Sequence, residues 1–595
     1  MIIQVGFMKK TFKHFISILI AITCIFSVNC KNGCKPFHFH KYDQQIKQEE
    51  FLKEKATCQT SAIYYYSCKC GAKGEETFND TITLSHDFSA RVEDEKYLKT
   101  PATCQSGAEY YFSCTTCGLS LNLGSTFKSD KLGEHVFDEQ IPDGALIKDE
   151  ATETSSAVYY KSCICGAKGT DTFTYGEPLR DYNFSEKQQF LPTSLTISLY
   201  DTENSIYGFT YNTSKRPLRP VIQIAKGSSL ENYEEYPAHT EEATSSAEGG
   251  TTFKYYISKI EVPMNDSSTY TYRIYDKYVK TGTQSVTITT KDLSANSFSF
   301  AHVSDSQHSS GNGNQFGSVL SKIVGVNDFV LHTGDVVEWS EYEDEWKSML
   351  HGNFAYLSKL PIMAISGNHE TTYQAGSNET YKHFNNKIPY QTTKKGYFYS
   401  FTYGNAKFIM LNTNVLDGNK LKNDQYEYLV NELKNNDKTW TFVALHNPLY
   451  SAGSWGSNPA KNQISLSLQK QLSGIFAEYG VDVVLQGHDH VISRTLPIKA
   501  DGTTSSETWN LDNASGVSYS IDPDGVIYVL NGPASNQTRS PYEDYNSALY
   551  YYAEKSNPMS WADFKIEGNT LTVTVNYFSG TKVLNYKTWG IKKSA

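Results

Sequence analysis

Five apolar segments in the second half of the chain each stop at a polar residue, and this pattern constrains the fold most. They begin at Phe298, Asp328, Leu360, Thr439 and Val481 and read FSFAHVSD, DFVLHTGD, LPIMAISGN, TWTFVALHN and VDVVLQGH. The stretches between them contain three sets of apolar residues, and the spacing of each set places its members on one face of a helix. The sets are Phe316, Val319, Leu320 and Ile323; Tyr426, Leu429, Val430 and Leu433; and Leu468, Leu472, Ile475 and Phe476. Buried strands alternating with amphipathic helices predict an α/β domain over residues 293–595.

The residues that end these segments are of types that bind metal ions. They are Asp305-Ser306-Gln307, Gly334-Asp335, Gly367-Asn368-His369-Glu370, His446 and Gly487-His488-Asp489-His490. In α/β folds, loops beyond the carboxyl ends of strands form the ligand site, so we expect these side chains to converge. Oxygen ligands and imidazoles together suit a pair of first-row divalent or trivalent ions, which would attract a phosphate group although the net charge of the chain is -10. His488 and His490 could both reach the site from one tight turn with Asp489 facing away, because residues two apart on an extended segment point to the same side.

The ordered set DSQ, GD, GNHE, His446 and GHDH resembles the calcineurin-like metallophosphoesterases, and GHDHVISRTLP resembles their purple acid phosphatase-like branch. The resemblance covers roughly residues 190–595 and implies a two-sheet α/β (α+β) sandwich with two bound ions of Fe, Zn or Mn. By motif, Asp305, Gln307 and His490 would bind the first ion, and Asp335 would bridge both. The second ion would be bound by Asn368, His446 and His488. A hydroxide between the ions would attack phosphorus, and His369 would protonate the leaving group as general acid.

The sequence departs from that branch at two places. Glu338 stands where purple acid phosphatases have the tyrosine that ligates ferric iron, so we expect neither a violet colour nor a fixed preference for Fe(III). Trp455 stands near a position where those enzymes have substrate-binding histidines, and an indole suits an aromatic or sugar-bearing ester. Trp455 and His308 are therefore the candidate residues of a substrate pocket.

The leading functional hypothesis is hydrolysis of small phosphate monoesters by a metal-dependent phosphatase. The same motifs serve phosphodiester or nucleotide hydrolysis, which is the second enzymatic hypothesis. The third is a surface adhesin with a vestigial phosphatase domain.

Residues 35–180 contain three copies of one cysteine-rich unit. ATCQTSAIYYYSCKCGAKGEETF starts at Ala56, ATCQSGAEYYFSCTTCGLSLNLGSTF at Ala102 and ATETSSAVYYKSCICGAKGTDTF at Ala151. A histidine stands 18 positions before the first cysteine, or before Glu153 in the third copy. Three cysteines and one histidine of one copy could complete a tetrahedral zinc site, and the glycine after the last cysteine would free backbone N–H groups to face sulfur. The candidate ligands are His40, Cys58, Cys68, Cys70, His86, Cys104, Cys114, Cys117, His135, Cys163 and Cys165.

Two questions about these copies stay open at this point. Disulfides between copies are the alternative to zinc, because small secreted modules commonly carry them. Glu153 replaces the first cysteine of the third copy, so a site within that copy would be Cys2HisGlu or empty. The copies resemble the tyrosine-rich Cys/His repeats of bacterial and protist surface proteins, which implies a cell-surface or glycan contact.

Residues 186–292 show the period-two alternation of a β-sandwich of about seven strands. The predicted strands start at Ser194, Ile206, Pro220, Phe253, Tyr270 and Ser285. MNDSSTYTYRIYD, which starts at Met264, resembles the tyrosine corner of fibronectin type III domains. This region is expected to be a spacer without chemistry.

The N-terminus predicts export. Three lysines followed by FISILIAITCIFSV, which runs from Phe15 to Val28, read as a signal peptide within residues 1–30. The alternative is a short anchor that is left uncleaved. All 11 cysteines lie at or before Cys165, and Asn-X-Ser/Thr sequons start at Asn183, Asn212, Asn265, Asn378, Asn513 and Asn536, which also suits a secreted or cell-surface glycoprotein. We expect no membrane span after cleavage, and the acidic net charge argues against nucleic-acid binding.

Overall fold

The computed structural model describes residues 39–120, 125–246, 251–309, 311, 313–371, 379–389 and 397–594. The predicted signal peptide and the sequon at Asn378 lie outside the described residues. The chain divides into two compact units, one of residues 1–103 with 107–133 and one of residues 104–106 with 134–595. Among the described residues, no helix has both the length and the apolar character that a membrane crossing requires.

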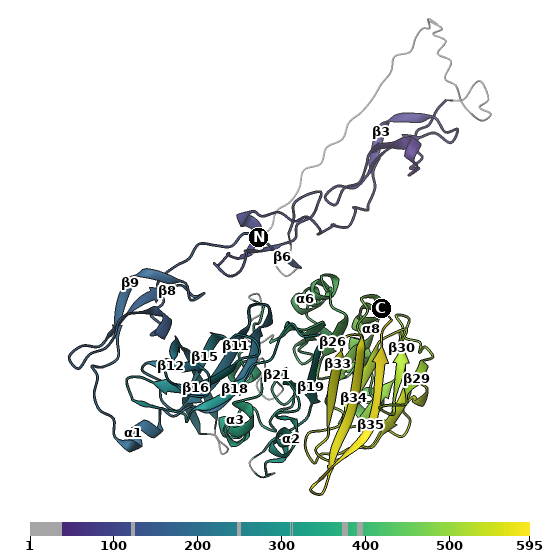
Figure 1. Cartoon of the computed structure of the whole chain (residues 1–595). Coiled ribbons are helices and arrows are strands. Elements are labelled where there is room, and N and C mark those ends of the chain that lie inside the picture. Colours follow the sequence, from purple (N-terminus) through teal and green to yellow (C-terminus); the bar gives the residue numbers. More distant parts are fainter. Residues whose placement is uncertain are drawn as a thin grey trace, which may run out of the picture. The chain divides into compact units, whose positions relative to one another are not determined.

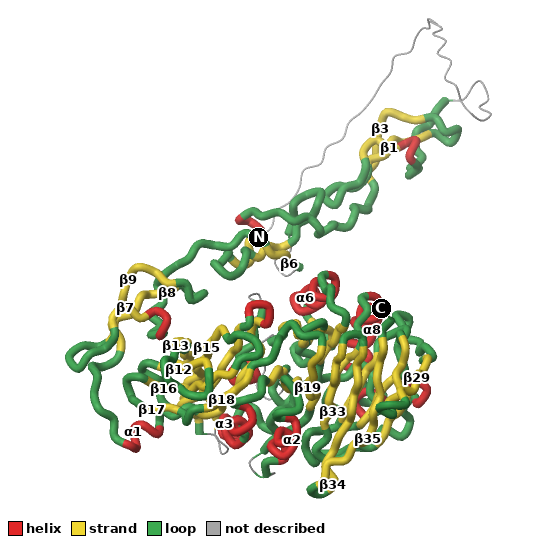
Figure 2. Tube along the Cα trace, viewed as in Figure 1, coloured by secondary structure: helices red, strands yellow, loops and turns green. Residues whose placement is uncertain are grey.

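Each cysteine-rich copy folds into a 3-10 turn and a three-stranded antiparallel sheet (Figure 2). The elements of the first copy are η1 (Glu49–Phe51), β1 (Leu52–Glu54), β2 (Ile63–Ser67) and β3 (Lys73–Asn79). Those of the second are η2 (Glu95–Tyr97), β4 (Leu98–Thr100), β5 (Glu109–Tyr111) and β6 (Thr126–Lys128). Those of the third are η3 (Gly144–Leu146), β7 (Ile147–Asp149), β8 (Ala157–Ser162) and β9 (Lys168–Tyr175).

After the short helix α1 (Phe184–Gln188), residues 193–289 form two antiparallel sheets. One has the strand order β10 (Thr193–Asp201), β11 (Ile206–Thr213), β15 (Thr252–Pro263), β14 (His239–Ser246). The other has the order β13 (Glu234–Pro237), β12 (Pro220–Lys226), β16 (Thr269–Asp276), β17 (Thr281–Gly282), with β18 (Val286–Thr289) also paired to β16. The six predicted strands are present, and Tyr270 Oη accepts a hydrogen bond of 2.8 Å from the backbone N–H of Asn265, as in a tyrosine corner.

Residues 297–592 contain two large mixed sheets (Figure 1). The first has the order β21 (Ile362–Ala364), β20 (Phe329–His332), β19 (Ser297–Val303), β33 (Trp561–Glu567), β34 (Thr570–Ser579), β35 (Lys582–Lys592), β30 (Val517–Ile521), β29 (Thr508–Asp512). The second has the order β22 (Tyr399–Tyr403), β23 (Ala406–Met410), β26 (Trp440–Ala444), β27 (Val483–Gln486), β31 (Ile527–Asn531), β28 (Ile492–Thr495), β32 (Tyr550–Glu554). A two-stranded ribbon of β24 (Leu416–Asp417) and β25 (Lys420–Leu421) stands apart from both.

Aromatic residues fill the space between the two sheets. Phe300 of the first sheet meets Phe408 and Phe442 of the second edge to face, with ring centroids 5.2 and 5.4 Å apart. All three side chains are fully buried, so the two sheets share one continuous core. The α/β sandwich with two sheets that the sequence predicts is therefore present.

Helices cover the outer faces of the sheets, because each has one apolar stripe. Buried residues of α2 (Gln315–Ile323), α3 (Glu343–Gly352) and α4 (Phe354–Leu357) pack with those of β19, β20 and β21. Those of α6 (Asn423–Lys434) and α8 (Gln463–Glu478) pack with those of β26 and β27. The remaining helical turns are η4 (Thr202–Asn204), α5 (Glu379–His383), α7 (Ser454–Ser457) and η6 (Ser547–Leu549).

Candidate metal and phosphoester site

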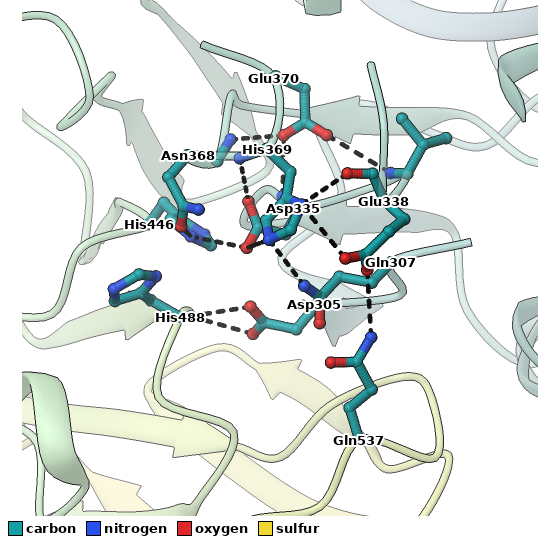
Figure 3. Close-up of polar contacts among 12 residues, drawn as sticks. Asp305, Gln307, Asp335, Glu338, Asn368, His369, Glu370, His446, His488 and Gln537 are labelled. Atoms are coloured by element: carbon teal, nitrogen blue, oxygen red, sulfur yellow. Dashed lines mark hydrogen bonds and ion pairs between the residues drawn. The ribbon is translucent and has the colours of Figure 1, made fainter. Parts of the chain in front are cut away.

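The polar residues after the five apolar segments come together, because the strands that carry them are parallel neighbours. In the first sheet β19, β20 and β21 run parallel, and in the second β26 and β27 do so. The loops after these strands carry all seven expected metal ligands and His369, and most of these residues lie around one centre in Figure 3. The side chains of Asp305, Gln307, Asp335, His446 and His490 are all buried.

Five of the expected ligands have a strained backbone. Asp305, Gln307, Asp335, His488 and His490 have φ angles of 53°, 36°, 55°, 75° and 51°, in the left-handed region. Non-glycine residues rarely adopt this conformation, and such strain concentrates at functional sites. The expectation that His488 and His490 share a side of an extended segment is therefore wrong: a tight left-handed turn aims both inward.

One group of the site is built around His446. Its Nδ1 donates to the carbonyl oxygen of Thr333 at 2.8 Å, so Nε2 is the ring nitrogen that faces the site. That Nε2 lies 3.0 Å from Asn368 Oδ1 and 3.2 Å from Asp335 Oδ2. Asp335, His446 and His488 each offer a ligand atom within 4.8 Å of the others. A ring nitrogen this close to two oxygens needs a positive charge between them, which a proton on Nε2 supplies in the structure and a bound metal ion would supply in its place.

A second group forms around Asp305. His490 Nδ1 donates to the carbonyl oxygen of Gln537 at 2.7 Å, and its Nε2 lies 3.3 Å from Asp305 Oδ1. Gln307 Oε1 is buried and has no hydrogen-bond partner. An orphaned buried amide oxygen is costly unless something binds it, so it fits the role of a metal ligand.

The charges of the site depend on one another. Burial opposes ionisation, but His446 lowers the pKa of Asp335 to about 2. Burial would lower the pKa of His446, but Asp335 raises it to about 9. Burial likewise works against ionised Asp305, yet His490 holds its pKa well below the usual range. Both carboxylates are thus held ionised by positive charge, which fits a cation site.

His369 lies beside these groups. Its Nδ1 donates to the carbonyl oxygen of Glu338 at 2.7 Å, and its Nε2 lies 2.9 Å from Gln307 Nε2 and 3.8 Å from Asp335 Oδ2. Burial lowers the pKa of His369, but Asp335 and Glu338 outweigh it and raise the pKa above its usual value. Glu338, which replaces the expected tyrosine, also accepts a hydrogen bond from Gln537 through its carboxylate.

Glu370 organises the site, and the sequence analysis assigned it no role. Its carboxylate accepts backbone hydrogen bonds from Asp335 and Val336 at 2.9 Å and from Gly367 at 2.6 Å (Figure 3). It therefore ties the loop after β20 to the loop after β21. The sequence signal that could have revealed this role is the position of Glu370 three residues after Gly367, in the loop that follows a buried strand.

The two candidate pocket residues differ in their surroundings. Trp455 packs against His488 with ring centroids 4.8 Å apart, and Lys461 lies over its ring at 5.1 Å. Asp489 turns away from the site and accepts backbone hydrogen bonds from Trp455 and Gly456. His308 instead contacts α3, because its Nε2 lies 2.9 Å from Ser348 Oγ, and only 6% of the residue is exposed.

The cysteine and histidine side chains of the N-terminal copies also gather, but not within one copy as expected. One cluster is Cys58, His86, Cys114 and Cys117, and another is Cys104, His135, Cys163 and Cys165. A third is His40, Cys68 and Cys70. The expected one-copy ligand set is wrong, since the first cysteine of a copy lies with the histidine and later cysteines of the next.

Comparison with known proteins assigns a class to this domain. Residues 298–492 match the family model of the calcineurin-like phosphoesterases. The chain therefore contains a calcineurin-like phosphoesterase domain, and the matched segment includes every expected metal ligand.

The relatives it resembles are purple acid phosphatases. Purple acid phosphatase 15 of Arabidopsis thaliana is 27% identical over 193 residues, which cover 31% of each chain. Acid phosphatase type 7 of Homo sapiens is 25% identical over 234 residues, which cover 36% of this chain and 50% of the relative. The chain thus spans about a third to a half of the length of these relatives.

A solved structure shares the fold. It is that of purple acid phosphatase PPD1 from seeds of yellow lupin (Lupinus luteus), with a TM-score of 0.55 and 16% identity. The superposition covers 74% of this chain and 80% of the lupin chain.

Proposed function

We propose that residues 293–595 form a metal-dependent phosphatase domain that binds two metal ions and hydrolyses small phosphate monoesters. The observation that carries the proposal is the meeting of seven oxygen and nitrogen ligands at the carboxyl ends of strands from two sheets. The orphaned Gln307 Oε1 and the left-handed ligand residues further support it.

The contacts support two groups of ligands. Asp305, Gln307 and His490 would hold one ion, since His490 Nε2 faces Asp305 Oδ1 and Gln307 Oε1 lacks a partner. Asn368, His446 and His488 would hold the other. Asp335 would serve both: its Oδ2 lies 3.2 Å from His446 Nε2, and its backbone carbonyl oxygen accepts a hydrogen bond of 2.9 Å from the backbone N–H of Gln307 in the first group. With Glu338 in place of tyrosine, we expect Mn, Zn or Fe to be accepted without a violet band.

When bound, the two ions would lower the pKa of a water nucleophile and neutralise the charge of the phosphate. His369 would give a proton to the leaving oxygen. Its Nδ1 is fixed on the Glu338 carbonyl oxygen, so Nε2, which accepts from Gln307 Nε2 at 2.9 Å in the structure, is the nitrogen that would carry the transferred proton once the Gln307 amide turns away from it. The backbone N–H of His369 donates to Asp335 Oδ1 at 2.9 Å, which keeps the acid next to the metal ligands.

The test separates the two roles. Asp335→Asn should lose bound metal, while His369→Ala should retain metal and lose about 10²- to 10⁴-fold of turnover. Metal is counted by elemental analysis of the purified full chain, and turnover is measured on p-nitrophenyl phosphate. Equal metal loss in both variants would contradict the division of roles. If the wild type takes up under one equivalent beyond any zinc held by its N-terminal cysteines and stays inert after loading with Mn, Zn and Fe, the adhesin hypothesis replaces the proposal.

Trp455 bears on the choice of substrate. Its indole beside His488 supports esters with a flat or apolar leaving group. Trp455→Ala should therefore raise KM for p-nitrophenyl phosphate more than for an alkyl phosphate. The ratio of rates on p-nitrophenyl phosphate and bis-p-nitrophenyl phosphate separates the monoesterase from the phosphodiesterase hypothesis.

We also propose the organisation and location of the chain. Residues 1–30 would be a signal peptide, residues 35–180 three surface repeats, and residues 186–292 a fibronectin type III-like domain. The Tyr270 hydrogen bond to the Asn265 backbone supports the fibronectin-like assignment. We expect a secreted or cell-surface protein, which N-terminal sequencing of the mature chain and glycosidase digestion would test.

A further inference from the structure

The cysteine-rich copies contain two sets of four side chains in an arrangement that the phosphatase does not use. Within each set, one atom from each of four ligands lies within 4.8 Å of all the others. Each set consists of three sulfur atoms and one imidazole nitrogen. This is the complete ligand set of a closed structural zinc site, which leaves no open position for catalysis.

The sulfur atoms inside the sets lie close together and are not joined as disulfides in the structure. Cys58 Sγ lies 3.7 Å from Cys114 Sγ, and Cys104 Sγ lies 3.1 Å from Cys163 Sγ. Both are much longer than the about 2.05 Å of a disulfide. Sulfur atoms bound to one zinc ion at about 2.3 Å with tetrahedral angles would be about 3.8 Å apart.

The imidazoles complete the two sets. His86 Nδ1 lies 3.4 Å from Cys117 Sγ, and His135 Nδ1 lies 3.2 Å from Cys165 Sγ. His86 and His135 also stack on the aromatic ring two residues later, Phe88 and Phe137, which fixes their orientation.

The turns between the paired cysteines are preorganised for thiolate binding. Gly118 and Gly166 follow these cysteines with φ angles of 71° and 85°, where a side chain would be strained. Backbone N–H groups then face the first sulfur of each turn. Those of Thr116 and Cys165 interact with the sulfur atoms of Cys114 and Cys163, respectively.

The ligands of each set come from two consecutive copies. Cys58 belongs to the first copy, whereas His86, Cys114 and Cys117 belong to the second. Likewise, Cys104 of the second copy lies with His135, Cys163 and Cys165 of the third. Residues 104–106 accordingly belong to the same compact unit as the third copy.

This register explains why the third copy has Glu153 in place of a cysteine. Residue 153 is the counterpart of Cys58 and Cys104, whose partners all lie in the following copy. No fourth copy follows within the chain, so a cysteine at this position would have no site to complete. Glu153 is exposed and belongs to neither set.

We propose that Cys58 with His86, Cys114 and Cys117, and Cys104 with His135, Cys163 and Cys165, each bind one structural Zn²⁺ ion that is shared by two consecutive copies. Each ion closes a chain loop that runs from one copy into the next. Metal binding therefore stabilises the succession of copies and not each copy alone.

Double variants of the full chain distinguish this register from sites within one copy. Co²⁺ is the probe, because thiolate-to-cobalt charge-transfer absorption arises only at cysteine ligands and the phosphatase site has none. Cys58→Ser, Cys114→Ser and the double variant should lose the same amount of absorption, since they disable one site. Cys104→Ser with Cys114→Ser should lose the absorption of two sites.

The reverse result would overturn the proposal. In that result, the double variant at Cys58 and Cys114 loses the absorption of two sites, and the double variant at Cys104 and Cys114 loses the absorption of one. Glu153→Gln is the matched control and should leave the absorption unchanged. If the third copy held a site of its own with Glu153 as a ligand, this variant would change the absorption. Turnover of p-nitrophenyl phosphate checks that each variant still folds.

A measurement on the unsubstituted chain keeps the test independent of folding defects. During stepwise removal of zinc by a chelator, Cys58, Cys114 and Cys117 should become open to alkylation together. Cys104, Cys163 and Cys165 should form a second such group. Cysteines that resist alkylation until a reductant is added would be disulfides, and this result would refute the zinc sites.

Discussion

The buried carboxyl group of Glu343 predicts how the stability of the second unit depends on pH. Glu343 begins α3, and its Oε1 accepts a hydrogen bond of 2.7 Å from Asn212 Nδ2. Its Oε2 lies 3.4 Å from His383 Nε2, and the His383 ring stacks on Trp346 with centroids 4.1 Å apart. Burial raises the pKa of Glu343 to about 8, and burial lowers the pKa of His383.

The sign of the effect follows from proton uptake. A carboxyl group with a pKa near 4.5 in the unfolded chain and about 8 in the folded chain binds a proton on folding between these values. Its contribution to stability is full below pH 4.5 and is lost as the pH rises through 8. At 1.36 kcal/mol per pKa unit, the whole window corresponds to about 4 to 5 kcal/mol.

Glu343→Gln removes this dependence, because a neutral amide keeps an acceptor for Asn212 but cannot ionise. Relative to the wild type, the variant should gain about 3 kcal/mol or more in free energy of unfolding between pH 5 and pH 9. Urea denaturation over this range measures the difference. Asp344→Asn, at the exposed neighbouring position, is the control. Its free energy of unfolding should keep a constant difference from that of the wild type over this pH range. Parallel pH curves for Glu343→Gln and the wild type would refute the reasoning.

Two further substitutions test how the site is held together. Glu370→Ala removes the acceptor of four buried backbone N–H groups, each worth about 1 to 3 kcal/mol, so metal affinity should fall sharply. The loss should be smaller in Glu370→Gln, which keeps one oxygen. Wild-type metal affinity in the alanine variant, measured by competition with a chromogenic chelator, would speak against an organising role. Gly367→Ala would place a Cβ 2.0 Å from Asp335 Oδ1, so we expect metal and turnover to be lost while circular dichroism is unchanged. A fully metallated and active Gly367→Ala protein would show that this approach is not required.

The site could be predicted from sequence because its residues sit at the ends of strongly apolar strands. Each of the five segments carries a buried strand followed by its polar loop, so the order of motifs along the chain already implied convergence. The same reasoning could not show that Glu370 is an acceptor for backbone N–H groups of the loop after β20. Nor could it find the left-handed turn at His488 and His490, since histidine lacks the glycine signal that usually marks positive φ.

Other features escaped prediction because polar sequences form part of the sheets. β13 and β14 are edge strands made mostly of polar residues, so their apolar alternation is weak. The register of the cysteine clusters was missed for a different reason. One copy already contains three cysteines and one histidine, which are enough ligands for a zinc site. Only the arrangement in space shows that Cys58 lies with Cys114 of the next copy.

The central claim is that the loops after five strands hold two metal ions side by side. A crystal structure of the metal-loaded protein, with anomalous scattering recorded at the metal absorption edges, tests it directly. The account predicts two peaks about 3.5 to 4 Å apart, with Asp335 between them. A single peak, or peaks remote from Asp335, would contradict it.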